Sequence, residues 1–129
     1  MRLNPDCIRD ILLTVEENTT FDKAFVYDYN SYKQYSFLES YTHDEIIYHI
    51  HQAELNFLFS KVSYCDNGKL AIIFDLSPTA HEFISNIRSK SNWSKTKEIA
   101  NKVGSTSINT FIEISSNVIS SLISKQFGI

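Results

Sequence analysis

Residues 42–64 constrain the fold of this chain most strongly, because a capped helix there runs directly into a strand. Thr42 and Glu45 have the spacing of a capping box, in which each side chain satisfies a backbone N–H at the start of a helix. Asn56 is expected to end the helix, since Asn tolerates the left-handed conformation found at such ends. Apolar residues at helical spacing predict a buried face of Ile46, Ile50, Ala53 and Phe57, flanked by Ile47. The opposite face carries Asp44, Glu45, Tyr48, His51, Gln52 and Leu55.

A β-hairpin is predicted directly after this helix. Two apolar runs, residues 58–64 and 70–75, flank a turn that contains Asn67 and Gly68. Asn-Gly is a strong hairpin signal, because both central residues of a type I′ turn need positive φ. A helix followed by a hairpin is the expected order of the recognition helix and the wing in a winged helix-turn-helix-like domain.

The flanking segments complete this domain. Asn4, Pro5 and Asp6 are typical of a helix start, and apolar spacing extends the predicted helix from Pro5 to about Asn18. Residues 24–28 and 35–38 are interpreted as short strands or extended pieces, so that a regular second helix is reduced to a single turn or absent. Ser77 and Pro78 are expected to cap another helix, whose apolar face is Ala80, Phe83, Ile84 and Ile87.

The last third of the chain is predicted to be helical. After a polar linker at residues 88–92, a short helix at residues 93–103 ends at Gly104 and carries three lysines, Lys95, Lys97 and Lys102. A long helix at residues 106–126 has a wide apolar face. We expect this face to pack on its own domain or on a second copy, while docking on another protein or on a membrane surface stays open. The helix contains Asn109, Glu113 and Asn117, which argue against a transmembrane span.

The expected fold class is therefore α+β: a winged helix-turn-helix-like domain at residues 1–87, with a helical C-terminal extension at residues 88–129. A length of 129 residues with 43% hydrophobic content suffices for one domain with a real core. Cys7 and Cys65 are too few for a disulfide framework, and each is expected to be a small buried apolar side chain. No signal-peptide pattern opens the chain, so a cytoplasmic location is expected.

The net charge of −3 conceals an asymmetry. Residues 1–87 carry 6 Lys and Arg against 13 Asp and Glu, whereas residues 88–129 carry 6 against 2. A protein that docks on duplex DNA needs cations on its docking face to displace condensed counterions. An acidic body with a basic extension does not have that distribution.

Motifs for catalysis or metal binding are not evident. His49 and His51 are two residues apart on one helix and therefore point in very different directions, whereas ligands on one helix face need a spacing of three or four. His81, in the next helix, has no Cys or carboxylate at ligand spacing. No activated nucleophile, glycine-rich loop or marked carboxylate pair is recognisable. We therefore predict no enzyme, no metal, no cofactor and no small-molecule substrate.

Four blocks of the sequence resemble a known family. They lie at residues 3–6 (LNPD), 48–50 (YHI), 77–84 (SPTAHEFI) and 93–97 (WSKTK), within a similarity that spans nearly the whole chain. These blocks resemble domain-of-unknown-function family twenty-five-thirteen, a group of small phage and prophage proteins. Ala80 and Asn56 stand where that family usually has Gly, which suggests slightly altered turns. The resemblance implies a winged-helix fold and a mobile-element origin, but no activity or catalytic residue.

Two functions are predicted, and the frequency of DNA binding among winged helices places nucleic acid first. As a regulatory nucleic-acid-binding protein, the chain would use Tyr48, His51 and Gln52 to face base edges. Lys61, Lys69, Lys95, Lys97 and Lys102 would meet phosphates. Asp44 and Glu45 argue against this, because they stand at the end of the helix that would enter the groove.

The alternative is a protein-interaction module that binds and modulates a host or defence protein. It would use the acidic surface, including Asp44, the aromatic Tyr48 and the C-terminal helix. The same helix is predicted to assemble a homo-oligomer. The residues expected to do so are Ile108, Phe111, Ile112, Val118, Ile119 and Leu122.

Overall fold

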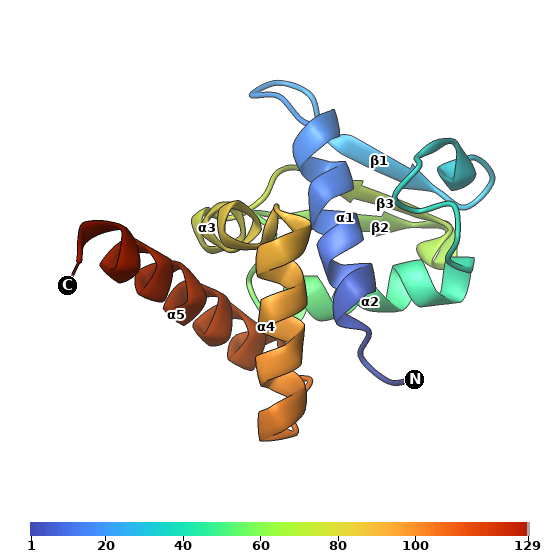
Figure 1. The fold of residues 1–129 in the computed structure, drawn as a ribbon. Helices are drawn as coiled ribbons and strands as arrows, with labels where there is room; N and C mark the ends of the chain where they lie inside the picture. Colours follow the sequence, from blue (N-terminus) through green and yellow to red (C-terminus); the bar gives the residue numbers. More distant parts are fainter. Residues whose placement is uncertain (129) are drawn as a thin grey trace. The chain divides into compact units, whose positions relative to one another are not determined.

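A computed structural model describes residues 1–128 and is of mixed α+β class (Figure 1). The described residues form five α-helices and one three-stranded antiparallel sheet. In chain order the elements are α1 (Pro5–Asn18), β1 (Phe25–Asp28), α2 (His43–Leu55), β2 (Val62–Cys65), β3 (Leu70–Ile73), α3 (Pro78–Ile87), α4 (Lys90–Val103) and α5 (Ile108–Phe127). Single 3₁₀ turns lie at Tyr32–Gln34 and Asp66–Gly68.

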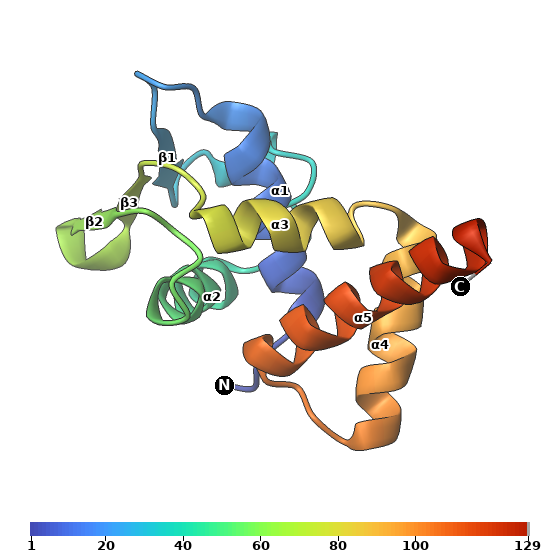
Figure 2. The same cartoon turned by 90° about the vertical axis from the view of Figure 1, so that its left-hand side faces the viewer.

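The chain divides into two compact units, Arg2–His81 and the chain from Glu82 onward, the latter joined by Met1. The sequence placed a domain boundary after residue 87, whereas this division falls within α3. The first unit contains the sheet together with α1 and α2. The second contains α4 and α5, which pack side by side (Figure 2).

The sheet has the order β1-β3-β2, so the central strand is the last in sequence. Phe25 pairs with Ile73 and Tyr27 with Ala71, and these four side chains are buried on one face. Helices α1 and α2 also pack on each other. Their buried residues include the expected Ile46, Ile50 and Ala53 of α2. In α1 they include Ile8, Ile11, Leu12 and Val15, the apolar residues whose helical spacing predicted that helix.

The predicted helix starts are confirmed by their caps. Asn4 accepts the N–H of Asp6 at 3.0 Å, and α1 spans the expected residues. Both bonds of the Thr42–Glu45 capping box are present, at 3.2 Å and 3.0 Å. In the second unit, α4 begins three residues earlier than predicted because Ser89 caps it, and residues 90–92 are helical rather than linker. Gly104 ends α4 in the left-handed conformation, as predicted.

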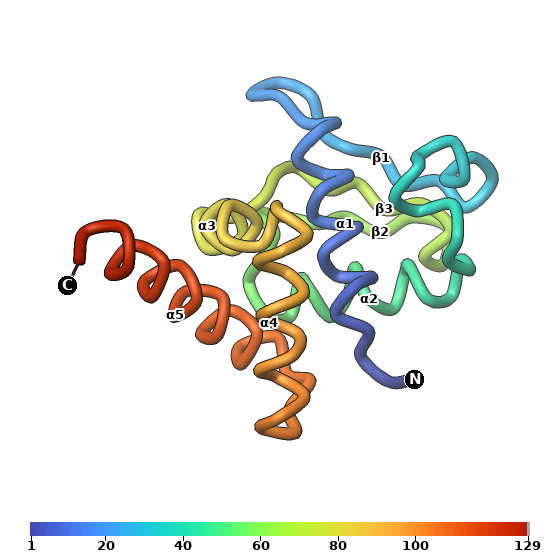
Figure 3. The backbone as a smooth tube through the Cα atoms, viewed as in Figure 1, coloured from blue at the N-terminus to red at the C-terminus, as the bar shows by residue number. Residues whose placement is uncertain are grey.

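The prediction of an extended piece at residues 35–38 is wrong. The segment between β1 and α2 instead forms successive turns, in which Leu38 N–H donates to the Tyr35 carbonyl and Tyr41 N–H to the Leu38 carbonyl (Figure 3). The hydroxyl of Tyr32 donates to the Tyr41 carbonyl at 2.7 Å, and the hydroxyl of Tyr41 donates to Asp10 at 2.6 Å. The first of these bonds closes the loop on itself, and the second attaches it to α1, without a regular second helix.

The hairpin is confirmed with a longer turn than a two-residue one. Cys65 pairs with Leu70, so four residues connect β2 to β3, and Asp66, Asn67 and Gly68 all have positive φ. Both strands are shorter than the apolar runs that predicted them. Cys7 is buried as expected, and burial raises the pKa of its thiol to about 12. Cys65 is exposed, contrary to the prediction, because the turn begins directly after it.

The capping box should make stability depend on pH. Bonds from the backbone and hydroxyl of Thr42 lower the pKa of the Glu45 carboxyl from its usual 4.5. Because the folded pKa is depressed, this contribution is fully present above pH 4.5 and is lost as the pH falls through the folded pKa. Urea unfolding between pH 3 and 7 should therefore show a shallower acid slope for Glu45→Gln than for the native chain. Thr42→Ala, as a control, should cost about 1 kcal/mol at neutral pH. Equal acid slopes would contradict the assignment.

Candidate interaction surface

Helix α2 ends in a Schellman motif that places an aromatic residue in an unusual conformation. Leu58 N–H donates to the Ala53 carbonyl and Phe57 N–H to the Glu54 carbonyl, both at 3.0 Å. This hydrogen-bond pair requires the residue between the helix cap and Leu58 to be left-handed. That residue is Phe57, with φ of 59°, and not Asn56, whose φ is −97°. The helix does end at Asn56, as predicted, but the left-handed conformation expected there belongs to Phe57. The prediction of a buried Phe57 is wrong.

The motif sends Leu58 into the core and Phe57 into solvent. Leu58 and Ala53 are fully buried, whereas the side chain of Phe57 is 81% exposed and that of Leu55 is 55% exposed. A bulky residue in the left-handed region costs about 1–2 kcal/mol. The chain therefore holds a large apolar side chain in water in a conformation that Gly would adopt without strain.

A polar cluster lies on the same end of α2. The hydroxyl of Tyr64, on β2, donates to Glu54 Oε1 at 2.9 Å, and His51 Nδ1 lies 3.5 Å from the same oxygen. The rings of His51 and Tyr64 meet edge to face, with centroids 6.1 Å apart. Burial and the bond to Glu54 raise the pKa of the Tyr64 phenol above its usual range. We call His51, Glu54, Leu55, Phe57 and Tyr64 the α2 C-terminal surface.

The structure brings only part of the predicted binding residues to this surface. His51 belongs to it. Asp44 is exposed at the opposite end of α2, next to the cap. Tyr48 is half-buried with its ring against His49, and Gln52 is half-buried. The exposure of Phe57 was not predicted, because its position in the helical pattern continued the buried stripe. Only the hydrogen bonds at the helix end show that the backbone turns away from the helix at this residue.

The predicted phosphate-binding lysines are dispersed and mostly engaged. Lys61 lies 5.1 Å from the centroid of the Phe74 ring and Lys69 lies 5.4 Å from that of Tyr29. In the second unit, Lys97 lies 5.6 Å from the Trp93 ring, and Lys102 lies 3.4 Å from Glu98. Lys95 is exposed beside a shallow hollow of about 170 Å³ between α4 and α5. Four of these five ammonium groups therefore lie near an aromatic ring or a carboxylate.

The predicted oligomer residues of α5 fall into two groups. Ile108, Phe111 and Val118 are buried, and the Phe111 ring packs 5.5 Å from that of Trp93 on α4. Ile112 and Ile119 are half-buried, and Leu122 is exposed together with Ile123 and Phe127. The first half of α5 therefore packs within its own unit, and only its last turns expose apolar side chains.

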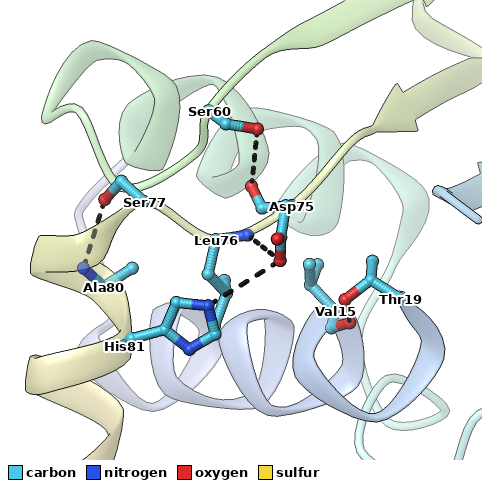
Figure 4. Close-up of polar contacts among 8 residues, drawn as sticks. All are labelled: Val15, Thr19, Ser60, Asp75, Leu76, Ser77, Ala80 and His81. Atoms are coloured by element: carbon cyan, nitrogen blue, oxygen red, sulfur yellow. Dashed lines mark hydrogen bonds and ion pairs between the residues drawn. The ribbon is translucent and has the colours of Figure 1, made fainter. Parts of the chain in front are cut away.

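A second polar group lies where β3 leads into α3 (Figure 4). His81 Nε2 lies 3.8 Å from Asp75 Oδ1, which also accepts the N–H of Leu76 at 2.7 Å. The hydroxyl of Ser60 donates to the main-chain carbonyl of Asp75 at 3.4 Å, and not to His81. These residues therefore lack the chain of hydrogen bonds that activates a serine nucleophile.

Two negative findings apply to residues 1–128. Nowhere in this range do three His, Cys, Asp or Glu side chains gather into a group that could hold a metal ion. None of the helices in the range combines the length and the apolar character needed to cross a membrane.

The fold and this surface define a small α+β protein with an apolar and acidic helix end presented to solvent. Over residues 2–107 the chain matches the family model described as Hypothetical protein (DUF2513), so it belongs to that family. This confirms the resemblance seen in the four sequence blocks. No curated protein and no solved structure matches the chain.

Removing the strained side chain should stabilise the fold. Phe57→Gly should raise the free energy of unfolding by about 0.5–1 kcal/mol, because Gly adopts positive φ without a Cβ clash. Leu55→Gly is a matched control, since Leu55 is also exposed but helical, and it should lose about 1 kcal/mol. Chemical denaturation of the three proteins measures both changes. A destabilised Phe57→Gly variant would show that Phe57 contributes to folding.

Proposed function

We propose that this chain is a winged-helix protein whose α2 C-terminal surface binds a protein partner with a basic surface. The order α1-β1-α2-β2-β3 with sheet order β1-β3-β2 supports the winged-helix assignment. In this assignment α2 is the recognition helix and β2-β3 is the wing. The 3₁₀ turn at Tyr32–Gln34 then stands where a helix-turn-helix has its second helix.

The observation that carries the proposal is the exposed Phe57 in a strained backbone. Strained residues persist where the surrounding structure enforces them, and they gather at binding sites. Phe57 and Leu55 are two large apolar side chains at one helix end. Burying such anchors in a recess of a partner is the usual source of affinity in protein interfaces.

The charges on α2 favour a partner with a basic surface. The helix has no Lys or Arg; of its carboxylates, Glu54 lies on the α2 C-terminal surface, and Asp44 and Glu45 lie at the other end of the helix. The unit Arg2–His81 has 12 Asp and Glu against 6 Lys and Arg, a formal charge of −6. Inserting α2 into a DNA groove would place these carboxylates among phosphates, whereas a basic protein surface would be attracted to them.

Nucleic-acid binding is the second candidate, and the charge of α4 favours it. This helix carries Lys90, Lys95, Lys97 and Lys102 against a single acid, Glu98. In that function α4 would contact phosphates, while α2 would have to be kept away from them. Tyr48, His51 and Gln52 would then have no role in reading bases.

A photo-crosslinking experiment tests the proposal directly. The photoreactive residue p-benzoylphenylalanine is placed at position 57 of the full chain, and at position 33, an exposed residue of the same unit, as a control. The chain is expressed in its source cells and irradiated. The expected result is a protein adduct of defined mass at position 57 that is absent at position 33. Adducts that are identical at both positions, or none at position 57, would contradict the proposal.

The nucleic-acid alternative is tested in parallel. Fluorescence anisotropy of random duplex DNA is measured with the native chain at several salt concentrations. We expect no binding in the micromolar range at about 150 mM salt. Micromolar binding that weakens steeply with salt, and that is lost when Lys95, Lys97 and Lys102 are changed to Glu, would replace the proposal by DNA binding through α4.

A further inference from the structure

Strand β1 is an edge strand of the sheet. It pairs with β3 on one side only. A hollow of about 150 Å³, lined by Asn18, Lys23, Ala24, Phe25, Val26 and Tyr35, lies against the strand. The side chain of Val26, at the middle of the strand, is 49% exposed. The outer face of the strand is therefore exposed at Val26.

The register shows which backbone groups face outward. Tyr29 N–H donates to the Lys69 carbonyl at 2.9 Å, which marks Tyr29 and Lys69 as a hydrogen-bonded pair. Since bonded and non-bonded pairs alternate in an antiparallel ladder, Tyr27 and Phe25 also bond to β3. Val26, opposite Ile72, must then direct its N–H and its carbonyl away from β3. A free edge of this kind is a template for another strand.

The charges along β1 suit an antiparallel copy of the same strand. Lys23 precedes the strand and Asp28 ends it, so its two ends carry opposite charges. Antiparallel pairing centred on Val26 sets the two Val26 residues opposite each other. It also sets the small Ala24 opposite Asp28 and brings the Lys23 end of each strand alongside the Asp28 end of the other. No like charges meet in this arrangement.

We propose that two copies of this chain associate through β1, in an antiparallel pair about a two-fold axis at Val26. The pairing joins two three-stranded sheets into one of six strands, with a self-complementary interface. The two Val26 residues exchange N–H to carbonyl hydrogen bonds, and their exposed side chains cover each other. The other edge, β2, is left free because Tyr64 on that strand belongs to the α2 C-terminal surface.

Sedimentation of the full chain over a range of concentrations tests this pairing. Val26→Pro removes the outward N–H without removing a bond to β3, and Pro is tolerated on such edges. It should weaken dimerisation about ten-fold or more, because two symmetric hydrogen bonds are lost. Val26→Thr keeps the N–H and the branched side chain and should leave the dimer intact. Lys23→Glu should weaken the dimer about two- to five-fold, and less in high salt.

Hydrogen exchange on the native chain provides a measurement that needs no variant. The Val26 amide should exchange quickly at low concentration and slowly where the dimer forms. A chain that is monomeric at all concentrations overturns the proposal. So does a Val26 amide whose exchange does not change with concentration. A dimer that survives Val26→Pro but is lost in Ile123→Ser would also overturn it and assign association to α5. The Phe57→Gly variant should dimerise normally, which separates this pairing from the proposed partner surface.

Discussion

The buried imidazole of His49 joins the two helices on which the first unit depends. Its Nδ1 donates to the Glu45 carbonyl at 2.7 Å, and its Nε2 accepts the N–H of Asn4 at 2.8 Å. The residue is only 1% exposed, and both of its ring nitrogens are hydrogen-bonded. Asn4 is the cap of α1 and Glu45 belongs to the capping box of α2. One side chain therefore ties the start of α1 to the first turn of α2, and the direction of α2 determines what its other end presents.

The sequence predicted the features that depend on neighbouring residues. The caps at Asn4 and Thr42, the glycine end at Gly104 and the Asn67 turn each follow from chemistry within four residues along the chain. The apolar spacing of α1 and α3 likewise identified side chains that are buried. These signals are local, and the mixed α+β class followed from them.

The errors occur where a distant contact or a competing bond decides the conformation. Residues 35–38 have the composition of a strand, yet the phenols of Tyr32 and Tyr41 hold them in turns, and one of those bonds reaches Asp10 on α1. At the end of α2, either Phe57 or Leu58 could complete the buried stripe. The Schellman hydrogen bonds place Leu58 in the core and leave Phe57 exposed, and the candidate surface depends on that exposed ring.

The division of the chain into two units also separates its chromophores. All seven tyrosines lie in Arg2–His81, and several of them hold that unit together, whereas the single tryptophan, Trp93, is buried on α4 in the other unit. The ring of Trp93 packs against that of Phe111 on α5, so its emission depends on the packing of α4 on α5. Tyrosine fluorescence therefore reports on the unit Arg2–His81, and tryptophan fluorescence reports on the other unit. Comparing the two signals during unfolding shows whether the two units unfold together or one after the other.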